Sequence, residues 1–256
     1  MILKNKVVIV TGASRGVGAS VAKVLANEGA AVCVNYLKNA DQANQVVEAI
    51  DGQGGKAFAH QADVTVYSDV EAMVEEVVNA YSKVDVVVNN ALPTYKFDPA
   101  APYTSIETVE WDNFLQQIDG AVKGALNMVK AAMPHMKAQR FGKVINISTN
   151  LVYNPVVTYY DYTTAKSALV GLTRNLAAEL GQYGIRVNLI AGGLLRTTDA
   201  SSVTTDEVFE LVANSTPLRQ AISVEEFAQS VLLFASDWSN AITGQSISVD
   251  GGLTMP

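Results

Sequence analysis

Two residues of this sequence, Tyr162 and Lys166, have side chains whose types and spacing suit acid–base chemistry. Residues four apart on a helix share one face, so the phenol and the ammonium could act together. A free tyrosine has a pKa of about 10, and it works near neutral pH only when a positive charge stabilises its phenolate. A tyrosine and a lysine at this spacing are usually a surface pair, so this interpretation depends on the other motifs.

A glycine-rich segment, Thr11–Gly18, is the second candidate site, with glycines at positions 12, 16 and 18. It follows a short apolar run and precedes a segment of helical period. Glycine permits a tight turn and a close backbone approach, so that N–H groups at the start of a helix meet a pyrophosphate. Ordinary turns also use glycine, but a strand before the segment and a helix after it favour a dinucleotide site.

The charges near this segment predict which dinucleotide binds. Sites that prefer NAD usually offer a carboxylate to the adenosine ribose at the end of the second strand. No acid stands there in this sequence, which reads Asn35-Tyr36-Leu37-Lys38. Lys38 and Arg15 could instead meet a 2′-phosphate. The sequence therefore predicts NADPH rather than NADH; the alternative is that both cations are only solvated.

Hydrophobic periodicity indicates the elements that must position these residues. Apolar residues recur at helical spacing within residues 17–25, 70–78 and 169–180. Strands that alternate with helices predict right-handed βαβ units and a parallel sheet covered on both faces. The seven candidate strands are short runs rich in Val and Ile: Val7–Val10, Ala31–Val34, Lys56–Ala59, Val84–Val88, Val144–Ile147, Val187–Ile190 and Ile247–Val249.

Composition excludes several classes of protein. With 49% hydrophobic and 17% charged residues, the chain is not disordered. Its net charge of −7, without a basic run, argues against binding to nucleic acid or to a membrane surface. Cys33 is the only cysteine, and His60 and His135 have no partners at metal-ligand spacing, so we expect neither a disulfide nor a metal. No signal peptide or long apolar span is present, which favours a cytoplasmic protein.

Further motifs follow the glycine segment in one order: Asp63-Val64, Asn89-Asn90-Ala91, Ser148-Thr149, Tyr162-x3-Lys166, Arg186-Val187-Asn188, Gly193-x3-Thr197 and an ending from Thr243-Gly244-Gln245 to Asp250-Gly251-Gly252. Over essentially the whole chain this series resembles the short-chain dehydrogenase/reductase family, and it is most similar to the 3-oxoacyl-(acyl-carrier-protein) reductases. The resemblance implies a Rossmann-type, doubly wound, seven-stranded parallel sheet in a single domain over residues 1–256. It also implies NAD(P)-dependent carbonyl reduction or alcohol oxidation, and a homotetramer or homodimer.

By motif position, the resemblance also implies which residues hold the cofactor. The pyrophosphate and the adenosine phosphate would lie on the glycine segment, the adenine along the third strand, the ribose near the fourth strand, and the carboxamide near a threonine after the sixth. The residues implied, together with the two at the end of the second strand, are Gly12, Ser14, Arg15, Gly16, Gly18, Asn35, Lys38, Asp63, Val64, Asn90, Ala91, Tyr162, Lys166 and Thr197.

The implied mechanism has Tyr162 donate a proton to the substrate oxygen while the cofactor delivers hydride to the carbonyl carbon. Lys166 would lower the pKa of the tyrosine and bind the nicotinamide ribose. The family's catalytic serine usually lies 13 residues before the tyrosine, and Thr149 stands there. We expect Thr149 to supply this hydroxyl, with the neighbouring Ser148 as the alternative.

Four regions leave alternatives open. Ile118 stands where the family often has an asparagine that relays protons, so the relay is missing or rerouted. Tyr95, Phe97 and Tyr103, in the long loop Leu92–Thr108, could line a substrate pocket or simply pin the loop. Asp161 could tune the neighbouring tyrosine, although a first-turn helix acid is the usual role. The late segment Val224–Ser236 has more apolar residues than one sheet face needs, which indicates a subunit interface.

The function that these observations favour is reduction of a ketone carbonyl by NADPH, with a 3-oxoacyl thioester among the candidate substrates and Tyr162 as the proton donor. One alternative is a dehydrogenase of a sugar, a polyol or another secondary alcohol on the same machinery. A second alternative, from another class, is a cofactor-binding protein with little turnover. Thr149 and Ile118 suggest that alternative because both depart from the family pattern.

Overall fold

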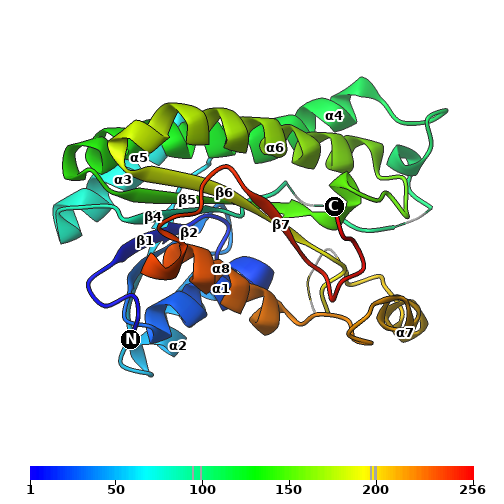
Figure 1. The fold of residues 1–256 in the computed structure, drawn as a ribbon, viewed down its shortest axis with the longest axis horizontal. Helices are drawn as coiled ribbons and strands as arrows, with labels where there is room; N and C mark the ends of the chain where they lie inside the picture. Colours follow the sequence, from blue (N-terminus) through cyan, green and yellow to red (C-terminus); the bar gives the residue numbers. More distant parts are fainter. Residues whose placement is uncertain (94, 99, 197, 199–200) are drawn as a thin grey trace.

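Seven parallel strands form one sheet in the order β3-β2-β1-β4-β5-β6-β7 in the computed structural model of the protein (Figure 1). The structure describes residues 1–93, 95–98, 100–196, 198 and 201–256. The strands are β1 (Val7–Val10), β2 (Ala31–Tyr36), β3 (Lys56–Gln61), β4 (Val86–Asn89), β5 (Gly142–Thr149), β6 (Ile185–Gly192) and β7 (Ser246–Val249). The prediction of a seven-stranded parallel sheet is confirmed.

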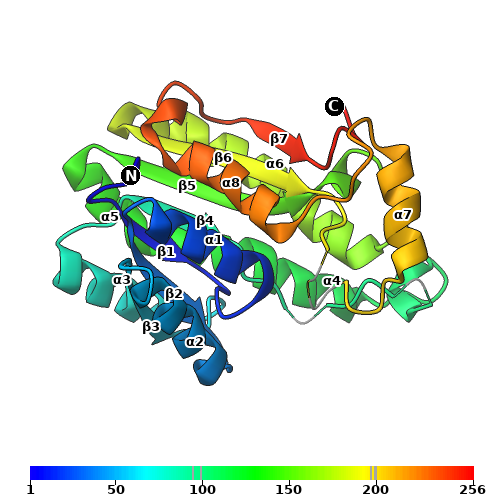
Figure 2. The ribbon, with the colours of Figure 1, turned by 90° about the horizontal axis from the view of Figure 1, so that it is seen from below.

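Helices cover both faces of the sheet, and this explains why its central strands are almost wholly apolar. Figures 1 and 2 show a layer of helices on each face. One face carries α1 (Gly16–Asn27), α2 (Ala40–Asp51) and α8 (Val224–Ala235), and the other carries α3 (Tyr67–Tyr81), α5 (Gly124–Gln139) and α6 (Tyr160–Leu180). All four residues of β1 are buried between these layers.

Two further helices lie beyond the ends of the strands. Helix α4 (Trp111–Ile118) continues through a π-helical turn over 119–123 into α5. Helix α7 (Asp206–Ser215) follows the loop after β6 and lies at the edge of the molecule (Figure 2). In the described part of the chain, no helix is long and apolar enough to span a lipid bilayer.

Most apolar residues of α8 are covered within the chain, and the subunit interface expected on this segment stays a prediction. Val224, Phe227 and Val231 are buried, and α8 packs along α1. A capping box between Ser223 and Glu226 starts the helix. Most of the apolar surplus therefore lies in the core, between a sheet face and a second helix, while Leu233 is 39% exposed.

The order of the strands creates the place where a ligand would bind. The chain begins in the middle of the sheet, at β1, runs outward to β3, and then crosses to β4 on the other side of β1. Val8 of β1 accordingly pairs with Val32 of β2 and with Val86 of β4. In doubly wound sheets the crevice outside the carboxyl ends of such strands is the usual ligand site.

Candidate active site

The glycine segment leaves β1 as a tight turn whose backbone only glycine adopts without strain. Gly12 has a φ of +61° and Gly16 a φ of +54°, both in the left-handed region. A Cβ atom at Gly18 would lie 2.4 Å from the carbonyl oxygen of Gly12. At Gly16, by contrast, a Cβ atom would meet nothing within 4 Å. The turn is thus tightly packed at Gly18 and open at Gly16, where α1 starts. This open space at the start of a helix fits a pyrophosphate.

Hydrogen bonds tie this turn to the neighbouring strand ends. The Thr11 hydroxyl accepts the backbone N–H groups of Asn90 and Ala91, each at 3.0 Å. The Asn90 amide donates in return to the carbonyl oxygens of Thr11, at 2.9 Å, and of Gly12, at 3.1 Å. The residues expected near the pyrophosphate and near the ribose therefore form one connected structure.

Asn35 supports the turn from inside the protein. It is 2% exposed, and its Oδ1 accepts the Gly12 N–H at 3.1 Å. Its Nδ2 donates to the carbonyl oxygen of Ala62 at 3.1 Å. Since backbone partners occupy both ends of the carboxamide, the geometry fits a role in positioning Gly12 better than a direct contact with a cofactor.

The other residues expected at the adenosine end surround this turn at the carboxyl ends of β1 to β3. Arg15 and Lys38 are both exposed. Asp63 accepts the N–H of Thr65 at 2.9 Å and its hydroxyl at 2.7 Å, so its carboxylate shapes the turn after β3. Val64 is buried beneath that turn. Thr197, expected near the carboxamide, lies outside the described residues, although Thr198 lines the cavity described next.

The expected catalytic residues line one cavity of about 140 Å³ at the carboxyl ends of the strands. Parts of the chain that are distant in sequence meet there, including α1, the ends of β4, β5 and β6, and helices α6 and α8. The lining residues are Val17, Asn90, Leu92, Phe97, Ile147, Ser148, Thr149, Tyr162, Lys166, Gly192, Gly193, Leu195, Thr198 and Phe227.

The polar groups of this cavity have distinct partners. The Thr149 side chain is hydrogen-bonded to the side chain of Tyr162, and its Oγ1 also accepts the N–H of Leu151 at 3.3 Å. Ser148 Oγ instead donates to the backbone carbonyl of Lys166 at 3.2 Å. Lys166 Nζ donates to the carbonyl oxygen of Ile147 at 2.8 Å and lies 5.9 Å from the centre of the Tyr162 ring. Of the two hydroxyl groups, that of Thr149 is the one joined to the phenol.

Burial dominates the protonation of the pair. It raises the pKa of Tyr162, and the hydrogen bond with Thr149 lowers it by less. Burial also lowers the pKa of Lys166 to about 8. The tyrosine is therefore a protonated phenol at neutral pH, ready to donate, while most of the lysine is still charged.

The structure also reveals an interaction that the sequence concealed. Tyr95 stacks on the Tyr162 ring, with centroids 5.0 Å apart, and its hydroxyl donates to Asp161 Oδ1 at 2.9 Å. Asp161 does lie in the first turn of α6, as expected for a helix acid, but only 2% of it is exposed. The acid directly before Tyr162 was the one signal for this contact. Its partner Tyr95, 66 residues earlier, was expected to line a pocket or pin the long loop, but nothing in the sequence linked it to Asp161.

The region of the expected relay residue is apolar. Ile118 packs against the small cluster that includes Ala121, Ala165 and Leu169. The adjacent Gln117 is buried, and its Oε1 has no hydrogen-bond partner among the described residues. None of residues 117–119 lines the cavity, so no side chain from this point takes the place of a relay asparagine there.

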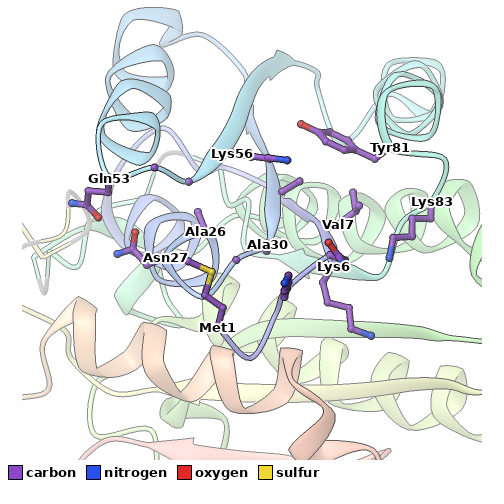
Figure 3. A pocket seen from close by; sticks show the side chains of 16 residues that line it. Met1, Lys6, Val7, Ala26, Asn27, Ala30, Gln53, Lys56, Tyr81 and Lys83 are labelled. Atoms are coloured by element: carbon purple, nitrogen blue, oxygen red, sulfur yellow. The ribbon is translucent and has the colours of Figure 1, made fainter.

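A second hollow, of about 620 Å³, lies at the opposite end of the sheet, where the strands begin (Figure 3). Lys6, Lys56 and Lys83 come to it from three separate segments. Lys83 is paired with Asp85 at 2.9 Å, and Lys6 with Asp237 at 3.7 Å. None of the motif residues lines this hollow. Within the described ranges, no group of three or more His, Cys, Asp or Glu side chains could hold a metal ion.

Known proteins are similar to this chain in both sequence and fold. A family model described as enoyl-(acyl carrier protein) reductase matches residues 12–254. The chain is 38% identical over 253 residues to the 3-oxoacyl-(acyl-carrier-protein) reductase FabG of Staphylococcus aureus, covering 98% of this chain and 99% of that protein. It is 33% identical over 257 residues to the FabG of Thermotoga maritima, with both chains fully covered.

Among solved structures, a mutant of a short-chain dehydrogenase/reductase from Serratia marcescens superposes with a TM-score of 0.87. It is 31% identical to this chain, and the match covers 99% of each. The sheet order, the glycine turn and the Tyr162–Lys166 pair agree with these similarities in sequence and structure. The chain therefore belongs to the short-chain dehydrogenase/reductase family.

Proposed function

We propose that this oxidoreductase uses NADPH to reduce a ketone carbonyl, with a 3-oxoacyl thioester as the first substrate class to test. The proposal rests on one observation: Tyr162, Lys166 and Thr149 line the same cavity, and this cavity lies beside the glycine turn. The similarity to 3-oxoacyl-(acyl-carrier-protein) reductases over nearly the whole chain supports the thioester.

We propose that Tyr162 is the proton donor. Bound NADPH would supply the hydride that adds to the carbonyl carbon. As the oxygen gains negative charge, the Tyr162 hydroxyl transfers its proton to that oxygen, giving an alcohol and a phenolate. The Thr149 hydroxyl, joined to the phenol by a hydrogen bond, would donate a second hydrogen bond to the same oxygen. The ammonium of Lys166 would stabilise the phenolate that remains.

The cofactor would be held mainly by backbone groups and a few local cations. The turn at Gly12, Gly16 and Gly18 fits the pyrophosphate, since the Arg15 side chain at the N-cap of α1 makes no capping hydrogen bond with the first N–H groups of the helix. Arg15 and Lys38 would meet the 2′-phosphate. Both are exposed, and the end of β2 carries no acid that would repel it. Ser14, Asp63, Val64, Asn90 and Ala91 would surround the rest of the adenosine and ribose.

One assay separates the possible activities. The absorbance of reduced nicotinamide would be followed from NADPH with simple ketones, an acetoacetyl thioester and a crotonyl thioester, and from NADP+ with a set of polyols. Oxidation of NADPH by the acetoacetyl thioester or by ketones is the expected result. Activity confined to the crotonyl thioester would indicate enoyl reduction, and activity confined to polyols would indicate a dehydrogenase. Cofactor binding without turnover across the panel would indicate a binding protein. Any of these three outcomes refutes the proposal.

We also propose that the protein is a cytoplasmic homo-oligomer, most simply a tetramer, with a dimer as the alternative. Its apolar side chains that remain exposed support this, among them Trp111 at 66% and Trp238 at 70%. Such large aromatic surfaces are costly to leave in water. Sedimentation velocity would measure the state directly, and a purely monomeric species at micromolar concentration would contradict the proposal.

A further inference from the structure

Aromatic side chains from the loop over 92–108 enclose the ring of Tyr162. Tyr95 stacks on it with ring centroids 5.0 Å apart and planes at 24°. Phe97 meets it edge to face, at 5.3 Å and 76°. Tyr159, from the start of α6, packs against both loop residues, at 6.0 Å and 5.5 Å. The phenol ring is therefore in contact with two aromatic rings of a segment more than 60 residues earlier in the chain.

A hydrogen bond anchors this loop to the helix that carries the tyrosine. The Tyr95 hydroxyl donates to Asp161 Oδ1 at 2.9 Å. The same oxygen accepts the backbone N–H of Tyr162 at 2.7 Å. One carboxylate oxygen thus joins the ring that stacks on Tyr162 to the backbone of Tyr162 itself.

Burying the Asp161 carboxylate in this anchor costs free energy, and this cost indicates that the carboxylate has a functional role. Asp161 is 2% exposed and Tyr95 is 7% exposed, so a carboxylate has been removed from water. Burial raises the pKa of Asp161, and the hydrogen bonds from Tyr162 and Tyr95 oppose that rise. The neighbouring apolar contacts of Phe97, Tyr103 and Leu151 already hold the loop to the body. A buried carboxylate is not needed merely to pin the loop.

This arrangement determines the direction of the Tyr162 hydroxyl. The ring has Tyr95 stacked on it, and its hydroxyl has Thr149 as its partner at the cavity. A tyrosine side chain has two main rotatable bonds, and ring stacking restricts both of them. If the stack loosened, the hydroxyl would sample directions away from the substrate oxygen, and proton transfer depends steeply on such alignment.

We propose that Tyr95 is a positioning residue, which holds Tyr162 aligned for proton donation through its stacked ring and its hydrogen bond to Asp161. The proposal rests on the proposed function, because alignment matters only if Tyr162 donates a proton. Tyr95 does not line the cavity, so it acts through Tyr162 and not on the substrate.

Four substitutions separate the parts of the arrangement. Tyr95→Phe keeps the ring and removes the hydrogen bond, and we expect kcat to fall about tenfold with KM changed less than about twofold. Tyr95→Leu also removes the stack, and we expect a fall of about a hundredfold. Asp161→Asn keeps an oxygen acceptor for the Tyr95 hydroxyl, and it should retain most of the kcat that Asp161→Ala loses.

The matched control is Tyr103→Phe. It removes one hydroxyl from the same aromatic cluster, where Tyr103 donates to the carbonyl oxygen of Lys96 at 2.7 Å and does not bond to Asp161. It should leave kcat unchanged. For every variant the Tm, the Kd of NADPH and the solvent isotope effect on kcat would be measured. A larger isotope effect in Tyr95→Phe, with Tm and Kd near the wild-type values, would support the positioning role because the proton step has become slower.

Two results would overturn the inference alone while the wild-type protein reduces carbonyls. The first is a kcat for Tyr95→Phe equal to that of the wild type. The second is a fall in kcat that Tyr103→Phe shares or that a matching loss of Tm and NADPH affinity explains. If the wild-type protein binds NADPH and reduces no carbonyl substrate, the proposed function fails, and the inference fails with it.

Discussion

Replacing Gly18 with alanine tests whether the glycine turn is shaped by close packing. The new methyl carbon would lie 2.4 Å from the carbonyl oxygen of Gly12 and 2.6 Å from the Asn90 amide nitrogen. Contacts of this kind are essentially never shorter than 3.0 Å, so the turn would have to move by at least about 0.6 Å. The carbonyl oxygen of Gly12 accepts the Asn90 amide, so the same movement also strains a hydrogen bond between the two strand ends.

The magnitude follows from these two effects. Overpacking costs about 1–3 kcal/mol, and the weakened hydrogen bond about 1 kcal/mol more. We therefore expect Gly18→Ala to lose about 2–4 kcal/mol of unfolding free energy and roughly 5–15 °C of Tm. A turn displaced by this distance also loses alignment with the pyrophosphate. If that loss is about 2–3 kcal/mol, the Kd of NADPH rises about 30- to 150-fold.

Two other glycines provide controls. At Gly16 nothing lies within 4 Å of an added Cβ, but φ is +54°, so Gly16→Ala should cost only about 1–2 kcal/mol of backbone strain. Gly171, inside α6, also has open space around it, and Gly171→Ala should stabilise the protein by up to about 1 kcal/mol. Thermal unfolding and fluorescence titration with NADPH measure both effects. A Gly18→Ala protein with wild-type Tm and Kd would refute the steric argument.

Three further predictions concern the hydroxyl, the cofactor phosphate and a buried lysine. Thr149→Ala should lower kcat/KM by about 10²-fold and Ser148→Ala by less than about tenfold, and the reverse order in steady-state kinetics would identify Ser148 as the donor. Replacing both Arg15 and Lys38 with alanine should lower the ratio of kcat/KM for NADPH over NADH by at least about tenfold; an unchanged ratio would leave the cations merely solvated. Burial lowers the pKa of Lys143 to about 8 from its ordinary 10.5, so the unfolded chain binds that proton more tightly. Stability should then rise with pH from about 8 to 10.5, by at most about 3 kcal/mol, and Lys143→Met should reduce the rise in denaturant titrations; an equal slope in both proteins would count against this pKa.

Runs of Val and Ile predicted the strands well because a parallel sheet buried on both faces leaves little choice of residue. Val7–Val10 is the first strand as predicted, and the runs beginning at Ala31 and Lys56 start their strands at those residues. The strand ends were predicted less well. Strand β2 continues through Asn35 to Tyr36, since backbone pairing with β3 extends past the apolar run. Polar residues can stay in a strand where their side chains find buried partners, as Asn35 does.

For the site, too, the sequence predicted the local motifs but not the contacts between distant segments. The types and spacing of Gly12, Gly16, Tyr162 and Lys166 indicated a dinucleotide site and an acid–base pair, because such short-range motifs depend on local backbone geometry that the sequence encodes directly. The choice between Thr149 and Ser148 depended on which hydroxyl meets the phenol, and only the packing of β5 against α6 places the Thr149 group there.

By itself the sequence determined the fold class, the order of the motifs and the chemistry that their side chains could perform, because hydrophobic period and local spacing are properties of the chain. Only the tertiary structure decided how the apolar residues of α8 are used, what supports Gly12, and which residues enclose Tyr162. The contact between Tyr95 and Asp161 joins a loop to a helix 66 residues later. No local pattern records such a contact, since it exists only when the sheet brings the ends of β4 and β5 together.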